Sequence, residues 1–243
     1  MMKKGASSTS AENEDMRQML IAAAVDLLNS DGPEAVQIRK VATAARTSTM
    51  AVYKHFGGMP GLVNAVAEES LRRFGAAQAA PAQTDDPVAD FMVTGLAYRQ
   101  FALDNPHMCR LMFGVTSADG INAPRRNMFD TTVTTPMHPS AEYLFRCVQR
   151  CMAEGRIDGS PDDLSAVLLA AAKFWTMIHG FVMLELAGFW GTKDHAAWVL
   201  ASLTTDLFVA LGDSHDKVYG SAASTLSRAA TELDTARTAT DAR

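Results

Sequence analysis

The chain has 243 residues, of which 48% are hydrophobic and 20% charged, a composition typical of a globular protein rather than a disordered one. This length allows one large domain or two small ones, each with a buried core. The net charge of −5 excludes a uniformly basic surface. The three cysteines are too few for a disulfide framework, and their spacing matches no zinc module.

Basic residues cluster in one short window of this acidic chain. Residues 37–55 contain four basic side chains and no acidic one: Arg39, Lys40, Arg46 and Lys54. An acidic body with a short basic window indicates a protein that contacts a polyanion at one place.

Short helices are predicted over the N-terminal third. Residues 1–13 are expected to be a flexible arm. Apolar residues then recur with helical spacing from Met16 to Leu28, and Gly32 stands at the C-terminal cap position. Two short helices are predicted at 38–45 and 48–56. The first ends at a break near Arg46, and the second ends at Gly57.

Longer helices are predicted for the rest of the chain. One covers 60–74, and the composition of 75–87 indicates a joint between two parts. Further helices are predicted at 87–103, 106–113, 140–154, 161–190 and 194–211. The sequence "SPDD" predicts Ser160 as the cap of the longest helix and Pro161 as its first residue. Residues 213–243 are expected to be a disordered tail. The fold class is therefore all-α, in two parts and without a sheet.

The two short helices and the longer helix before them have the order of a helix-turn-helix motif. In such a motif the second helix enters the major groove of DNA, where hydroxyl side chains contact base edges and cationic or phenolic side chains contact phosphates. The alternative without a DNA-binding role is an ordinary short amphipathic helix that packs Val52 and Phe56 inward and exposes polar residues to solvent.

The segment "VQIRKVATAARTSTMAVYKHFGGMPGLVNAV" resembles the DNA-binding region of the tetracycline-repressor (TetR) family. The residues that carry the likeness are Val41, Ala42, Ala45, Ser48, Tyr53, His55, Phe56 and Leu62. The resemblance covers about residues 14–74. It implies a ligand-responsive transcriptional regulator, usually a repressor and usually a homodimer on a palindromic operator. It divides the chain into a helix-turn-helix domain at 14–60, a connecting helix at 61–74 and a ligand-binding and dimerisation domain at 75–212.

The resemblance also implies a set of DNA contacts, which are Gln37, Arg39, Arg46, Thr47, Ser48, Thr49, Met50, Tyr53, Lys54 and His55. Three positions depart from the family pattern. Arg46 replaces the usual turn glycine, where the backbone tends to be left-handed. Thr47 replaces a valine, and Met59 replaces a lysine that contacts phosphate.

The C-terminal half resembles one subgroup's ligand-binding domain, marked by Trp175, the His179–Gly180 pair and Glu185. Candidates for the lining of an effector pocket are Phe91, Phe101, Met108, Met112, Phe113, Phe145, Trp175, His179 and Met183. Such residues at helical spacing also suit an ordinary core, and His179 suits a core histidine. Candidates for the dimer interface are Phe181, Leu186, Phe189, Trp190, Trp198, Leu203 and Phe208.

The predicted protein is thus a ligand-responsive DNA-binding regulator, a repressor released from its operator by a small, largely apolar effector. Its expected partners are operator DNA, a second copy of the chain and the effector. The alternatives are an activator or ligand-blind regulator on the same fold, and an all-α enzyme or cofactor binder. The sequence contains none of the common catalytic or metal-binding motifs, so no enzyme activity, cofactor or metal is expected. The longest stretch without a charged residue, 55–67, is shorter than the ~20 residues of a membrane-spanning helix, so no membrane is expected. The expected location is the cytoplasm. Cys147 and Cys151, four residues apart, suit either core packing or a redox sensor.

Overall fold

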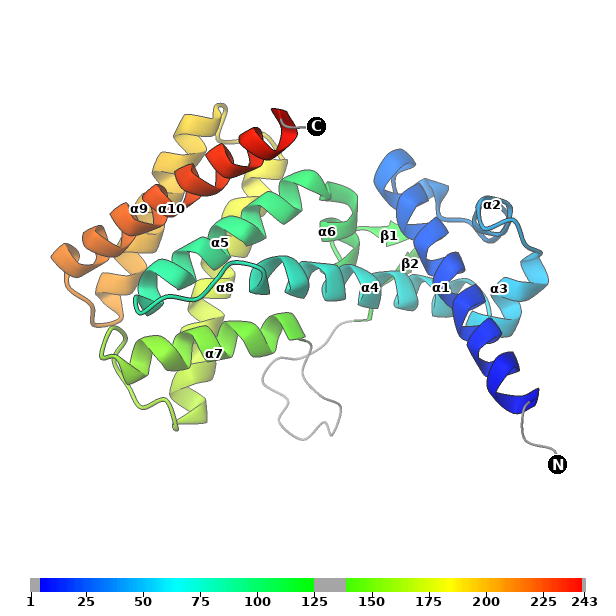
Figure 1. Cartoon of the computed structure of the whole chain (residues 1–243), viewed down its shortest axis with the longest axis horizontal. Coiled ribbons are helices and arrows are strands. Elements are labelled where there is room, and N and C mark those ends of the chain that lie inside the picture. The colour runs from blue at the N-terminus through cyan, green and yellow to red at the C-terminus, as the bar shows by residue number, and fades with distance from the viewer. Residues whose placement is uncertain (1–4, 125–138, 242–243) are drawn as a thin grey trace. The chain divides into compact units, whose positions relative to one another are not determined.

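The computed structural model describes residues 5–124 and 139–241. Within these ranges the chain forms ten α-helices, one short 3-10 helix and one hairpin of two-residue strands (Figure 1). The all-α fold class is therefore confirmed. The first four residues of the predicted arm, residues 125–138 and the last two residues of the predicted tail lie outside the described residues.

The chain divides into two compact units between residues 73 and 74. Among the described residues, the first unit contains 5–73 and also 104–124, and the second contains 74–103 and 139–241. Helix α4, Met59–Ala79, contributes residues to both units. The sequence had placed 104–124 with the C-terminal domain.

The first unit is built on α1, which spans Gly5–Asp31. Its other elements are η1 (Pro33–Ala35), α2 (Ile38–Ala44), α3 (Thr49–Phe56), the first part of α4, α6 (Pro106–Met112), and the antiparallel strands β1 (Ser117–Ala118) and β2 (Ile121–Asn122). Its core is apolar and fully buried, and it includes Leu20, Leu28, Val41, Val52 and Leu62. This core fixes α2 and α3 against α1 and α4.

Two glycines set the junction between α3 and α4. Gly57 caps α3 in the left-handed conformation, with a φ of 70°, and its amide donates to the carbonyl of Tyr53. Gly61 lies where α4 passes the end of α3. A Cβ atom there would lie 1.9 Å from the carbonyl oxygen of Phe56. The close approach of α4 to α3 therefore requires glycine at this position.

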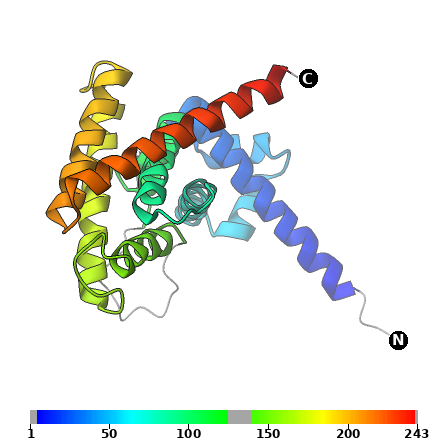
Figure 2. The same ribbon diagram turned by 60° about the vertical axis from the view of Figure 1, so that its left-hand side comes forward.

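The second unit packs its helices around α5, which spans Pro87–Asp104. Around it lie α7 (Pro139–Ala153), α8 (Leu164–Leu186), α9 (Lys193–Ala210) and α10 (His215–Asp241) (Figure 2). Phe91 of α5, Phe174 of α8 and Phe208 of α9 form the centre of its core, with ring centroids 4.4 to 5.6 Å apart. Aromatic contacts at this spacing add to the stabilisation that burial alone gives.

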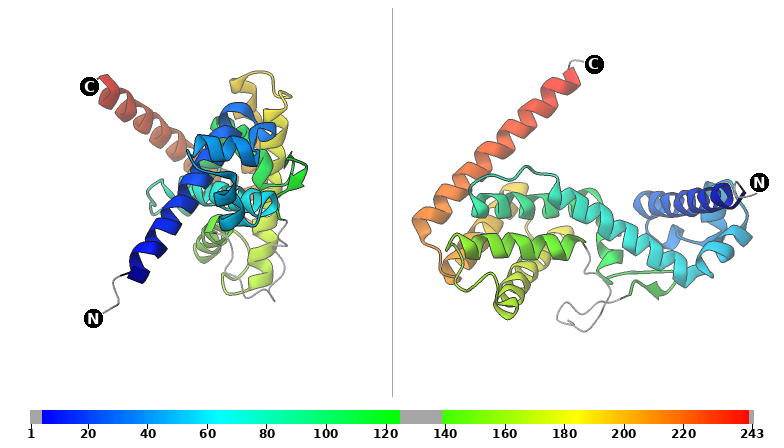
Figure 3. Two further views of the ribbon diagram at one scale, coloured as in Figure 1. Left: turned by 90° about the vertical axis from the view of Figure 1, so that its right-hand side faces the viewer. Right: turned by 60° about the horizontal axis from the view of Figure 1, so that its bottom comes forward.

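Helix α10 corrects the prediction of a disordered tail. The composition of residues 213–243 is polar, so it did not predict an apolar helix face that packs on the rest of the chain. Val218 is fully buried, and polar contacts add to the docking: Arg228 donates to Asp90 at 2.7 Å, and Thr225 donates to the carbonyl of Ala89 at 3.3 Å. The last turns of α10 extend away from the other helices of the unit (Figure 3).

Three other local predictions are also corrected. The first helix starts at Gly5, inside the predicted arm. Helix α8 starts at Leu164 rather than at Pro161, because Asp163 is the cap and its side chain accepts hydrogen bonds from the amides of Ser165 and Ala166. The hairpin β1–β2 was not predicted, since strands of two residues leave no period in a sequence.

Helix α8 is long and apolar enough to cross a membrane, with a mean hydropathy of 1.7 over its most apolar window. Length and composition are weak evidence, because the core helix of a soluble protein passes the same test. Here one side of α8 carries the core residue Phe174, and Leu169 and Leu184 are exposed.

Candidate nucleic-acid interface

The turn between α2 and α3 has the backbone that the motif requires. Arg46 has a φ of 52°, in the left-handed region, as predicted for the position of the usual glycine. The turn is closed by two hydrogen bonds, from the amide of Arg46 to the carbonyl of Thr43 at 3.0 Å and from that of Thr47 to Ala42 at 2.9 Å. The side chain of Arg46 is exposed, so its charge faces solvent at the edge of α3.

The N-terminal end of α3 presents small polar side chains and one thioether. Ser48 is the N-cap residue, but its hydroxyl makes no capping hydrogen bond. Ser48 is exposed, Thr49 is half-buried, and Met50 is 69% exposed. Hydroxyls and a methionine that stay open to solvent at the start of the second helix are suited to contact base edges.

The C-terminal end of α3 presents a phenol and two bases. Tyr53 is 52% exposed, Lys54 is exposed, and His55 is half-buried. The ammonium of Lys54 donates to the side-chain oxygen of Asn13 at 2.8 Å, which holds it beside α1. These side chains are suited to phosphate oxygens, which fix the register of a protein on DNA.

The first short helix adds two more candidates. Gln37 is the N-cap of α2, and its side-chain amide donates to the carbonyl of Glu34 at 3.1 Å. Arg39 is exposed in the first turn of α2. Met59 is buried, so it packs in the core and takes no part in phosphate binding.

Sequence reasoning missed two residues that support this surface. Asn13 orients Lys54, and Arg17 of α1 places its guanidinium 5.5 Å from the ring centroid of Phe56. Both act across a helix–helix contact, for which a helical period in one segment gives no signal.

The predicted pocket residues fall into the two units. Met108, Met112 and Phe113 belong to the first unit, and the other six belong to the second. None of the nine lines the groove described below. Their assignment to an effector pocket stays a prediction.

His179 has a polar partner inside the second unit. Its Nδ1 shares a hydrogen bond of 2.8 Å with the hydroxyl of Tyr98, and its ring lies 5.9 Å from that of Trp175. Burial lowers the pKa of His179, so the imidazole is neutral at neutral pH. Glu185 accepts a hydrogen bond of 2.8 Å from Arg99. The polar residues that mark the subgroup are thus paired within the unit, as core polar groups are.

Two of the seven predicted interface residues lie in the core of the second unit instead. Phe181 is buried against Trp190, with stacked rings 5.5 Å apart, and Phe208 is fully buried in the aromatic core. Neither offers surface to a second chain. Phe189 and Trp198 are 73% and 74% exposed, and Leu203 is also exposed. Leu186 is half-buried.

The cysteines are core residues. All three are buried, and burial raises the pKa of Cys109 and Cys151 to about 12 and that of Cys147 to about 11. The thiols are therefore protonated at neutral pH, whereas oxidation proceeds through the thiolate. Burial and these raised pKa values favour the core-packing interpretation of Cys147 and Cys151 over the redox sensor.

Two family models match the sequence. Residues 20–66 match the model described as bacterial regulatory proteins, tetR family, and residues 91–207 match the model described as tetracyclin repressor-like, C-terminal domain. No curated protein sequence matches the chain significantly.

Solved structures share the fold at low sequence identity. One is a protein of unknown function from Rhodococcus sp. RHA1, with 24% identity, a TM-score of 0.63, and coverage of 82% of this chain and 96% of that one. RolR in complex with resorcinol is 17% identical, with a TM-score of 0.61 and coverage of 88% and 95%. A TetR variant from Acinetobacter baumannii AYE, in complex with minocycline, is 21% identical, with a TM-score of 0.55 and coverage of 80% and 94%.

A helix-turn-helix head and a larger helical domain define a DNA-binding transcription regulator rather than an enzyme. The first matched segment lies on the helix-turn-helix part, and the second covers most of the larger domain together with residues 104–124 of the first unit. The chain belongs to the TetR family. The narrower resemblance, to the subgroup marked by Trp175 and the His179–Gly180 pair, stays a prediction.

Proposed function

We propose that this protein is a repressor that binds a palindromic operator as a homodimer and is released by a small-molecule effector. The observation that carries the DNA-binding role is the surface of α3. Its side chains for base and phosphate contact are open to solvent, and the window at 37–55 contains no acidic residue that would repel phosphates.

The proposed homodimer forms through α8 and α9. Large apolar side chains are exposed on these two helices and on the segment between them: Leu164, Leu169, Leu184, Phe189, Trp198 and Leu203. Exposed apolar side chains of this size and number favour an interaction surface. Two helices from each chain would form a four-helix bundle. To bind a palindromic operator, the two recognition helices of such a dimer must lie about 34–36 Å apart, the spacing of successive major grooves.

The proposed release acts through α4. This helix is continuous, and its residues 59–73 belong to the unit that carries α3. In the second unit, Phe74 of α4 lies with its ring centroid 4.7 Å from Tyr98 and 5.4 Å from Phe101. An effector that displaces α5 would therefore move α4 and change the spacing of the two heads. The effector needs only different affinities for the two arrangements.

A gel-shift titration on the DNA upstream of the gene tests this proposal. We expect one specific band at moderate salt that persists in an excess of random DNA and weakens when the effector is added. Absence of any specific band would contradict the operator-binding role. A reporter driven by the same promoter distinguishes the alternatives, because deletion of an activator's gene lowers expression and deletion of a repressor's gene raises it.

A further inference from the structure

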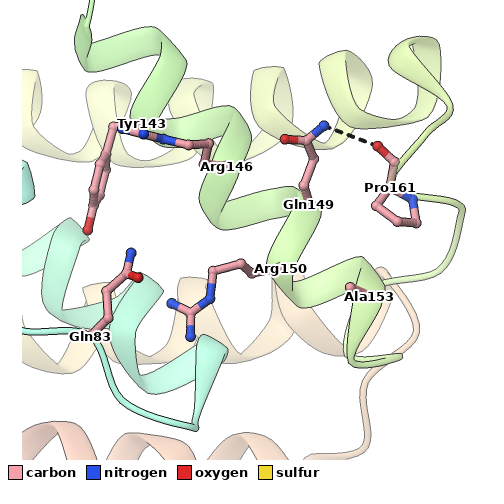
Figure 4. Close-up of a pocket in the computed structure, with 7 residues that line it drawn as sticks. All are labelled: Gln83, Tyr143, Arg146, Gln149, Arg150, Ala153 and Pro161. Atoms are coloured by element: carbon pink, nitrogen blue, oxygen red, sulfur yellow. Dashed lines mark hydrogen bonds between the residues drawn. The ribbon is translucent and has the colours of Figure 1, made fainter.

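A groove lies on the second unit between α7 and the segment that joins α4 to α5 (Figure 4). Its volume is about 580 Å³, within the range of small-molecule sites. It is lined by Gln83, Tyr143, Arg146, Gln149, Arg150, Ala153 and Pro161. No part of the interface or pocket predicted from the sequence includes these residues.

Arg146 supplies a cationic group that has no acidic partner among the described residues. Its guanidinium carbon lies 5.6 Å from the ring centroid of Tyr143, and its side chain is exposed. Within residues 5–124 and 139–241, no ion pair or hydrogen bond joins Arg146 to another side chain, although Glu142 precedes it by one helical turn. The guanidinium is therefore available to an anion from solution.

Arg150 supplies a second guanidinium, which is held in place. It lies four residues after Arg146 and therefore on the same face of α7. It donates to Asp90 at 3.0 Å and to the carbonyl of Thr84 at 2.8 Å. Asp90 also accepts from Arg228 at 2.7 Å. Two guanidiniums thus share one buried carboxylate, which fixes the guanidinium of Arg150 at the groove.

The remaining lining fits the body of a small molecule. Gln83 and Arg150 face each other across the groove (Figure 4). Gln149 turns its amide to the carbonyl of Pro161, to which it donates at 3.1 Å. Ala153 and Pro161 supply apolar surface to the groove near Gln149 (Figure 4).

We propose that this groove binds a small organic carboxylate. The planar guanidinium of Arg146 matches the two oxygens of a carboxylate in a paired hydrogen bond. The hydrocarbon part of the ligand lies along the stems of the arginines and toward Ala153.

A ligand in the groove would contact the segment that follows α4, because Gln83 belongs to the connection that begins after Ala79, the last residue of α4. This step rests on the proposed function: if the ligand is an effector, it draws the α4–α5 connection toward α7. The binding site itself does not depend on that role.

Calorimetric titration of the full-length protein, without DNA, tests the site. The probes are benzoate and cyclohexanecarboxylate, and the controls are the uncharged benzamide and cyclohexanecarboxamide. We expect saturable binding of at least one acid and at least about tenfold weaker binding of its amide, since hydrogen bonds to charged groups are the strong ones. Arg146→Gln should weaken the acid at least about tenfold. The same change at an exposed cationic residue away from the groove and from the DNA-binding surface, Lys217→Gln in α10, should leave it unaltered.

Three results would overturn the proposal: no saturable binding of either acid, equal binding of acid and amide, or unchanged affinity in Arg146→Gln. Circular dichroism of Arg146→Gln confirms that the variant is folded. A gel shift in the presence of the bound acid is scored separately. Binding without an effect on DNA leaves the site in place and removes its role as an effector site, so the two claims fail independently.

Discussion

At the scale of single residues, the proposed DNA-binding surface depends on side-chain chemistry at some positions and on backbone conformation at others. Lys54 illustrates the first, because its ammonium is held by Asn13 at the end of α3, where the proposed phosphate contact would add affinity without reading the base sequence. Arg46 illustrates the second, because its left-handed φ of 52° is a conformation that glycine adopts at lower cost.

Lys54→Gln should weaken binding to operator and random DNA alike, because it removes one phosphate contact. The slope of log affinity against log salt should fall in magnitude by about 1. Fluorescence anisotropy at several salt concentrations measures the slope. Lys217→Gln, at an exposed lysine of α10, is the matched control and should leave the slope unchanged. An unaltered slope in Lys54→Gln would remove this residue from the phosphate contacts.

Arg46→Gly should stabilise the protein by up to about 1 kcal/mol, because it relieves a left-handed backbone. If the exposed guanidinium also contacts phosphate, the same variant should bind DNA more weakly. Urea unfolding gives the first quantity and anisotropy the second. A loss of stability in Arg46→Gly would contradict the strain that we assign to this turn.

At the scale of elements, the helices are held by close approaches and by buried ion pairs. Gly61 lets α4 pass the carbonyl of Phe56, and Asp90 joins α5 to α7 and α10 through Arg150 and Arg228. The contact at Gly61 positions α3, and the ion pairs of Asp90 position α10, the helix that was not predicted from the sequence.

Gly61→Ala should destabilise the protein by about 1–3 kcal/mol, the usual cost of overpacking. The added methyl group of α4 meets the backbone carbonyl of Phe56, so α4 and the end of α3 would have to move apart. Gly95→Ala in α5 is the matched control. A Cβ there has nothing within 4 Å, so this change should be neutral or stabilising by up to about 1 kcal/mol. Urea unfolding distinguishes them, and equal stability of the two variants would disprove the close approach.

The second unit should lose stability in acid through Asp90. Burial acts to raise the pKa of this carboxyl, but hydrogen bonds from Thr84, Arg228 and Arg150 outweigh it and hold the pKa below its usual value. The contribution is therefore complete above the unfolded-state pKa of about 3.9 and is lost as the pH falls through the lower folded-state value.

Arg228→Gln should raise the folded-state pKa of Asp90, so acid unfolding of the variant should begin at a higher pH. Circular dichroism along a pH titration measures the midpoint, with Lys217→Gln as the control. Identical midpoints in wild type and Arg228→Gln would show that the ion pair does not stabilise the docked α10.

These elements also show what a sequence can predict here. The helix-turn-helix was predictable because its signals are local, namely the caps, the glycine at 57 and the unusual residue at the turn. The docking of α10 was not, because its partners lie more than 130 residues away, as in the bond from Arg228 to Asp90. The burial of Phe208 and the groove around Arg146 likewise arise from segments that meet only in the folded chain.

At the scale of the whole molecule, the account requires two chains. One chain leaves Phe189 and Trp198 largely exposed at the end of α8 and on α9. The proposed homodimer would cover these side chains and would present two recognition helices to the operator.

Trp198→Glu should shift the protein toward monomer, because it places a charge in the proposed apolar interface. The side chain is 74% exposed in the single chain, so the fold of the monomer should be unaffected. Sedimentation velocity measures the assembly. Met19→Glu, at an exposed methionine of α1, is the control and should remain a dimer. A dimeric Trp198→Glu variant would place the interface elsewhere.

The central claim, that α3 reads DNA as one half of a symmetric pair, is tested most directly by selection from a random-sequence duplex library. The full-length protein binds the library at moderate salt, and the retained duplexes are amplified and sequenced over several rounds. The account predicts enrichment of an inverted repeat whose half-sites are centred about one helical turn apart. Failure of any sequence to be enriched, or enrichment of a motif without two-fold symmetry, would contradict it.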